Sequence, residues 1–101
     1  GATPLIVAAS VAQADIVKQL LGLGENPRAV DLRLWTALHH AADKGSSRTV
    51  MHLLFGGADP LMKTEAGETA RDIAMARGAA QVVRLITAAM DAATAGGPPL
   101  P

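Results

Sequence analysis

The sequence repeats itself at an interval of 33 residues, and this period limits what the chain can fold into. A threonine begins each of three units, at Thr3, Thr36 and Thr69. The same offset relates several apolar positions: Ala8, Ala41 and Ala74; Val17, Val50 and Val83; Leu20, Leu53 and Ile86. A fixed period of this length is typical of stacked repeats, in which each unit buries its apolar face against its neighbours.

Two short helices are predicted in each unit. The threonine can cap the first helix by accepting a hydrogen bond from a free backbone N–H, and Pro4 suits the position that follows. We expect the first helices to end near Ala12, Gly45 and Gly78, where glycine permits a left-handed turn and alanine would cost about 1 kcal/mol. The pattern predicts second helices from Asp15 to Leu23, from Arg48 to Phe55 and from Gln81 to Met90. Since no alternating strand pattern occurs, the predicted fold class is all-α.

The second unit carries the clearest family pattern. Its segments TALHHAADKG at residues 36–45 and GADP at residues 57–60 resemble the ankyrin repeat family, and the resemblance extends over about residues 1–91. The resemblance implies a solenoid of helix–turn–helix units (about 1–33, 34–66 and 67–91) with projecting loops and a concave groove. Residues 92–101 are rich in Gly and Pro, so we expect a flexible tail. Its final P-x-x-P spacing can serve SH3 domains, but a linker is the more common meaning of such a segment.

The two ends of the stack differ in polarity. In the third unit Arg71 and Thr87 replace leucines of the earlier units, as expected of a terminal unit that faces solvent. The first unit instead carries Ile6, Val7 and Val11, which predicts a poor cap. Our hypothesis is that further repeats precede it in a longer protein.

An unusual loop precedes the second helix pair. Leu34 stands where the family usually has glycine, and Trp35 is the only tryptophan. Since Trp and Arg are frequent in binding hot spots, we predict that Arg33, Leu34 and Trp35 anchor a partner. The alternative is that Trp35 packs against a neighbouring loop or helix. The charged residues expected around these anchors are Asp43, Lys44, Glu65, Glu68 and Arg77, and the resemblance implies a groove lined by Ser10, Val11, Asp43, Lys44, Ala76 and Arg77.

The composition argues against several other functions. The formal net charge is zero, so no basic surface predicts binding to nucleic acid. The chain has no Cys, no apolar run long enough to span a membrane, and no nucleophile or phosphate-binding motif. His39 occupies the position at which the family's histidine bonds to the threonine of its own motif. Because neighbouring helical residues point about 100° apart, His39 and His40 do not suit one metal ion. We therefore expect no metal and no cofactor, and His40 is assigned no role.

The predicted function is a non-catalytic protein–protein interaction module. We expect a monomer that binds another protein or peptide, with neither nucleic acid nor membrane as a partner. It is expected to belong to a larger intracellular protein of the cytoplasm or nucleus. The alternative is a regulatory or structural role, in which the repeats pack against another domain of the same protein.

Overall fold

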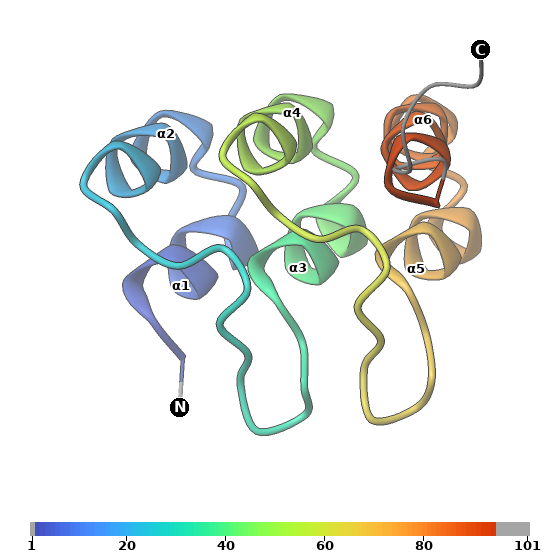
Figure 1. The fold of residues 1–101 in the computed structure, drawn as a ribbon, viewed down its shortest axis with the longest axis horizontal. Coiled ribbons are helices and arrows are strands. Elements are labelled where there is room, and N and C mark those ends of the chain that lie inside the picture. The colour runs from blue at the N-terminus through green and yellow to red at the C-terminus, as the bar shows by residue number, and fades with distance from the viewer. Residues whose placement is uncertain (1, 95–101) are drawn as a thin grey trace, which may run out of the picture.

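The computed structural model describes residues 2–94, which form six helices and no strand. The helices are α1 (Pro4–Ser10), α2 (Ala14–Gly22), α3 (Ala37–Lys44), α4 (Ser47–Phe55), α5 (Ala70–Arg77) and α6 (Ala80–Thr94). In Figure 1, α1, α3 and α5 lie in one row, α2, α4 and α6 lie in a second row, and the two long loops project beyond the first row. The predicted all-α stack of helix–turn–helix repeats is confirmed.

The ends of the helices follow from the residues at the repeat positions. The Oγ1 atoms of Thr3, Thr36 and Thr69 accept hydrogen bonds from the backbone N–H groups of the residues three positions later, at 3.2, 3.3 and 3.3 Å. The turns after α3 and α5 contain Gly45 and Gly78, with φ of 68° and 70°. Ala12 keeps the same left-handed conformation in the first unit, with φ of 56°, so the predicted strain at this alanine is present.

The core lies between the units. Helix α1 packs on α3 and α3 on α5, while α2 packs on α4 and α4 on α6. Small residues at the repeat positions let the first helices approach closely, because alanine has only one side-chain carbon to accommodate. The largest fully buried aliphatic side chains are Leu5, Leu38, Leu53, Ile86, Val17, Val50 and Val82. Each unit therefore depends on its neighbour to bury its apolar side chains.

The last helix is longer than the sequence pattern predicted. Helix α6 continues to Thr94, whereas we expected it to end at Met90 and the flexible tail to begin at residue 92. The reason is that residues 88–93 contain four alanines, the best helix former, and no glycine or proline that would stop the helix. The rest of the expected tail, with its P-x-x-P segment, lies outside the described residues.

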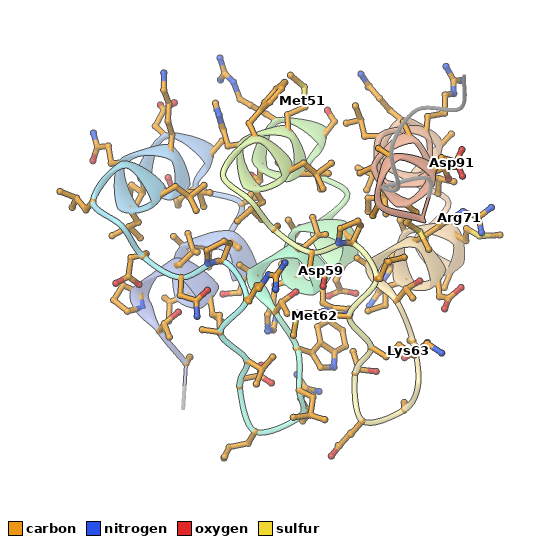
Figure 2. The ribbon with its side chains drawn as sticks, viewed as in Figure 1. Met51, Asp59, Met62, Lys63, Arg71 and Asp91 are labelled. Carbon is orange, nitrogen blue, oxygen red and sulfur yellow. The ribbon has the colours of Figure 1, made fainter. Side chains whose placement is uncertain are left out.

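The C-terminal end of the stack has a polar surface. The Arg71 Nε atom on α5 donates a hydrogen bond to the Thr87 Oγ1 atom on α6 at 2.8 Å. Figure 2 shows Arg71 and Asp91 at this end of the molecule, on the side away from α3 and α4. The third unit thus has polar side chains where the first two units have leucines. No helix of the described residues is long and apolar enough to cross a membrane.

Candidate partner-binding surface

The first projecting loop makes a tight turn around a single carboxylate. The Asp31 Oδ1 atom accepts hydrogen bonds from the backbone N–H groups of Arg33 and Trp35, at 2.9 and 3.0 Å. The backbone N–H of Asp31 donates to the Trp35 carbonyl oxygen at 3.0 Å, which closes the turn. Leu34 has a φ of 60°, a conformation that glycine adopts without strain and leucine does not. The turn is thus held by Asp31 and strained at Leu34.

The second projecting loop makes the same turn with a hydroxyl group. The backbone N–H of Thr64 donates to the Glu68 carbonyl oxygen at 2.9 Å, and its Oγ1 atom accepts from the N–H groups of Ala66 and Glu68 at 3.2 and 3.3 Å. The left-handed position is here occupied by Gly67, with φ of 80°. The two loops also contact one another, because the N–H of Glu65 donates to the carbonyl oxygen of Arg33 at 3.1 Å. The two tips therefore form one continuous surface.

Trp35 is a half-buried part of this surface. Its ring centroid lies 4.9 Å from that of His40 and 6.1 Å from that of His39. The Arg33 Cζ atom lies 5.0 Å from the centroid of the indole ring, within cation–π distance. Trp35 also packs against the buried core of the stack. Trp35 therefore packs against the neighbouring helix α3, as the alternative prediction described, and part of the ring remains open to solvent.

His40 connects the first loop to α3. Its Nε2 atom is 2.9 Å from the Asp31 Oδ2 atom, and both side chains are mostly buried. Burial acts to raise the pKa of Asp31, but the hydrogen bonds from His40 and from the backbone of Trp35 and Arg33 outweigh it, and the pKa lies below its usual value. A negative Asp31 therefore holds both the turn and the helix that follows. No role was predicted for His40, and the structure identifies this structural one.

His39 connects α3 to the second loop. Its Nδ1 atom accepts from the backbone N–H of Thr36 at 3.0 Å, so the ring proton lies on Nε2, which faces the Glu68 carbonyl oxygen at 3.2 Å. The Thr36 hydroxyl is 2.8 Å from Nδ1, which confirms the predicted bond within the motif. Burial lowers the pKa of His39, because the charged ring would lose its hydration, and the hydrogen bond to Glu68 offsets this only in part.

A hollow of about 310 Å³ lies beneath the loops, between the ends of α3 and α5. The Arg77 guanidinium and the Asp43 carboxylate form an ion pair across it, with an Nη2–Oδ1 distance of 2.7 Å. The Arg77 side chain is 61% exposed, so this pair stabilises the fold by less than about 1 kcal/mol and its groups remain accessible to a partner. The hollow is lined by Trp35, Asp43, Glu68, Ile73, Ala76 and Arg77.

The structure thus gathers four of the eight predicted binding residues at this hollow: Trp35, Asp43, Glu68 and Arg77. Arg33 and Leu34 lie on the loop tip, Glu65 lies on the tip of the neighbouring loop, and Lys44 is exposed at the end of α3. Of the expected groove residues, Ser10, Val11 and Lys44 do not line the hollow. Val11 instead lines a separate groove on the first unit, at the N-terminal end of the stack.

One exposed loop residue was missing from the predicted set. Leu32 is 87% exposed and Leu34 is 46% exposed, so the tip of the first loop carries two exposed leucines. Leu32 lies between Asp31 and Arg33, the residues joined by the first hydrogen bond of the turn, and its side chain is almost fully exposed. An apolar residue at the tip of a polar turn was the signal that could have identified it.

In the described part of the chain, no three His, Asp or Glu side chains are grouped as a metal site.

The comparisons with known proteins agree with this architecture. The model for ankyrin repeats (3 copies) matches residues 5–95, so this chain belongs to the ankyrin repeat family. Over 89 residues the chain is 39% identical to a putative E3 ubiquitin-protein ligase, XBAT35 of Arabidopsis thaliana, and 42% identical to a probable one, XBOS34 of Oryza sativa subsp. japonica. Over 76 residues it is 37% identical to the ankyrin repeat and SAM domain-containing protein 6 of Rattus norvegicus.

These relatives are much longer proteins. The matches cover 85% of this chain but only 19% of XBAT35 and 17% of XBOS34, and 74% of this chain but 9% of the rat protein. The similarity is therefore confined to the repeats. Ankyrin repeats are generally protein-interaction modules, and the rest of each relative has no counterpart in these 101 residues.

Proposed function

We propose that this chain is a non-catalytic module that binds another protein through the tips of its two loops and the hollow beneath them. The observation that carries the proposal is the pair of exposed leucines, Leu32 and Leu34, on a turn that Asp31 and His40 hold in place. Exposed leucines on a rigid turn offer apolar area to a partner without an ordering cost. The module acts as a monomer within a longer intracellular protein.

The hollow would provide specificity next to this apolar tip. Trp35 forms one wall, and Asp43, Glu68 and Arg77 supply two negative groups and one positive group. Mixed charges of this kind set the register and the rate of association more than the affinity. A partner segment with an apolar side chain for the leucines and polar groups for the hollow fits this surface. The Arg77–Asp43 pair can open to bind such groups because it is partly exposed.

The test is affinity capture with a variant in the loop and a matched variant elsewhere. The loop variant carries Leu32→Ser and Leu34→Gly and leaves Trp35 in place. The control is Phe55→Ser, because Phe55 is 85% exposed at the end of α4, in the row of helices away from the loops. Proteins captured by wild type are identified, and the affinity of each purified candidate is then measured by titration calorimetry.

We expect the loop variant to bind the partner at least about tenfold more weakly, which corresponds to about 1.4 kcal/mol, and the control to bind like wild type. Equal affinities for all three proteins would refute the proposed surface. Loss of binding in the control alone would place the binding site on the row formed by α2, α4 and α6.

A second candidate is that the repeats pack against another domain of their own protein. The length of the relatives favours it, since most of each relative lies outside the matched repeats. If the loop variant weakens the association of the repeats with the rest of the parent protein and with no external protein, this second function is correct.

Among relatives named as ubiquitin ligases, a repeat module could hold the protein that receives ubiquitin. An external partner that becomes ubiquitinated only through wild-type loops would support that role.

A further inference from the structure

The charges around the hollow between the ends of α3 and α5 do not balance. Its lining contains two carboxylates, on Asp43 and Glu68, and one guanidinium, on Arg77. Arg77 is already engaged by Asp43, since its Nε and Nη2 atoms both lie 2.7 Å from the Asp43 Oδ1 atom. The lining therefore has a net negative charge, and the carboxylate that leaves it unbalanced is that of Glu68.

The Glu68 carboxylate has no partner within the chain as the structure describes it. The contacts of this residue are made by its backbone: the carbonyl oxygen accepts from Thr64 and faces His39, and the N–H donates to the Thr64 Oγ1 atom. Among residues 2–94, the carboxylate takes part in no ion pair and no hydrogen bond. The backbone bonds thus hold the residue beside the hollow and leave its charge available to a partner.

The other walls of the hollow suit a long side chain that ends in a positive charge. Trp35 lines the hollow, and aromatic rings attract cations within about 6 Å of the ring centroid. This ring already attracts one cation of the chain, because the Arg33 Cζ atom lies 5.0 Å from its centroid, although Arg33 does not line the hollow. Ile73 and Ala76 add an apolar surface, on which the methylene groups of a basic side chain can pack.

We propose that the hollow binds one arginine side chain of the partner protein, with its guanidinium between the Glu68 carboxylate and the Trp35 ring. A guanidinium fits these two groups better than an ammonium, because it is planar, stacks on aromatic rings and donates two parallel hydrogen bonds to one carboxylate. The volume of about 310 Å³ is at the lower end for ligand pockets, which suits a single side chain. This inference rests on the proposed function, since it names the partner residue that the hollow selects next to the leucines of the loop tip.

Short peptides test the hollow before any partner is known. The probe is acetyl-Gly-Ser-Arg-Ser-Gly-amide, and matched peptides carry lysine, norleucine or glutamate in place of the arginine. Trp35 is the only tryptophan, so its indole N–H gives a single signal in a proton–nitrogen correlation NMR spectrum. At constant ionic strength we expect the arginine peptide to shift this signal until it saturates and the lysine peptide to bind more weakly. The norleucine and glutamate peptides should leave the signal unchanged.

A charge-neutral variant identifies the carboxylate responsible. Glu68→Gln keeps the size of the side chain and the backbone bonds to His39 and Thr64. It should weaken binding of the arginine peptide about fivefold, the effect of one partly exposed ion pair. The matched control is Glu65→Gln, because Glu65 is exposed on the same loop and does not line the hollow. It removes the same charge from the loop and should bind the peptide like wild type.

Selection from a random peptide library displayed on phage tests the inference in a longer partner segment. Peptides selected by wild type should share an arginine at a fixed distance from an apolar residue that contacts the loop tip. Selection by Glu68→Gln should lose the arginine and keep the apolar residue. Selection by the variant with Leu32→Ser and Leu34→Gly should lose the apolar residue and keep the arginine.

The proposal is overturned if the arginine peptide leaves the Trp35 signal unchanged, or if Glu68→Gln and Glu65→Gln weaken binding equally. Equal binding of the norleucine peptide would assign the hollow to an apolar side chain, and equal binding of the lysine peptide would mean that it selects charge alone. Either result refutes the arginine assignment. Selected peptides that require the two leucines but not Glu68 would refute this inference and leave the proposed function intact. Peptides that require Glu68 but not the leucines would do the reverse.

Discussion

The loop from Asp31 to Trp35 and the loop from Thr64 to Glu68 make the same turn with different side chains. In each, the side-chain oxygen of the first residue accepts two backbone hydrogen bonds, and the fourth residue has a positive φ. The first loop ends in a half-buried tryptophan and the second in Glu68, whose backbone carbonyl bonds to a histidine. The comparison teaches that the turn requires only an acceptor oxygen on the side chain of its first residue and a left-handed conformation at its fourth. The other side chains are free to serve recognition or to fasten the loop.

The largest difference between the loops is expected at their last residue. Trp35→Ala should lower the free energy of unfolding by about 2 kcal/mol, because the ring packs against two histidines and the core. Glu68→Ala should change it by less than about 0.5 kcal/mol, since the backbone carbonyl that bonds to His39 remains. Urea denaturation of both variants measures the difference. Equal effects would mean that the tryptophan contributes no more packing than a surface glutamate.

The first residue of each turn is expected to give the next largest difference. Asp31→Ala should cost about 2 kcal/mol, because it removes two backbone bonds and leaves His40 without its carboxylate. Thr64→Ala should cost about 1 kcal/mol, because only two weaker bonds to backbone N–H groups are lost. The control is Asp31→Asn, which keeps an acceptor oxygen and should be intermediate. A Thr64 variant as unstable as the Asp31 variant would show that the contact between Asp31 and His40 adds nothing to stability.

The charge of Asp31 also predicts a pH dependence. Its pKa in the folded protein lies below the usual value, so its contribution is present above the unfolded pKa of about 3.9 and is lost as the pH falls through the folded pKa. Thr64 does not titrate. In acid, the difference in stability between Asp31→Ala and wild type should therefore shrink, whereas the difference for Thr64→Ala should stay constant.

His39 couples α3 to the second loop, and its titration tests that coupling nearer neutrality. Burial lowers its pKa in the folded state, so below about pH 6.5 the unfolded chain binds a proton that the folded chain does not. Stability should fall as the pH drops from 6.5 towards the folded pKa. Urea midpoints between pH 8 and pH 5 should show this slope in wild type and a smaller slope in His39→Gln. Parallel curves would indicate that His39 is not the group responsible.

The repeat period accounts for most of what could be predicted. The register alone placed the six helices, the caps at Thr3, Thr36 and Thr69, and the strained turn at Ala12, because each depends on local backbone geometry. The family resemblance placed Leu34 where glycine is usual, and the structure gives this residue a positive φ. These features follow from hydrogen bonds between residues at most five positions apart.

The parts of the surface that depend on side chains from different units could not be predicted. The Arg77–Asp43 pair joins residues 34 positions apart, and the bond from Asp31 to His40 depends on how the loop folds back onto α3. Whether the Trp35 ring packs against α3 or extends into solvent depends on the space left by His39 and His40. A one-dimensional pattern gives the positions of such residues but not the rotamers that bring them together.

The smallest individual effects are expected at the left-handed position, and they have opposite signs in the two loops. Gly67→Ala should lower the free energy of unfolding by about 1 kcal/mol, and the cause is the backbone alone, because a Cβ there would meet no atom within 4 Å. Leu34→Gly should raise it by about 0.5 kcal/mol, since relief of the strained φ is partly offset by the entropy that glycine adds to the unfolded chain. Ala12→Gly, at the other strained position, is a control that should also stabilise.

Combined with the binding assay, this pair of substitutions separates stability from function. A Leu34→Gly variant that is more stable and binds the partner more weakly would show that leucine is present for recognition, at a cost to the fold. If Leu34→Gly is instead destabilising, the side chain packs more favourably than its 46% exposure indicates, and Leu34 belongs with Trp35 as a structural residue of the first loop. Leu32, at 87% exposure, would then be the one leucine of this tip available to a partner.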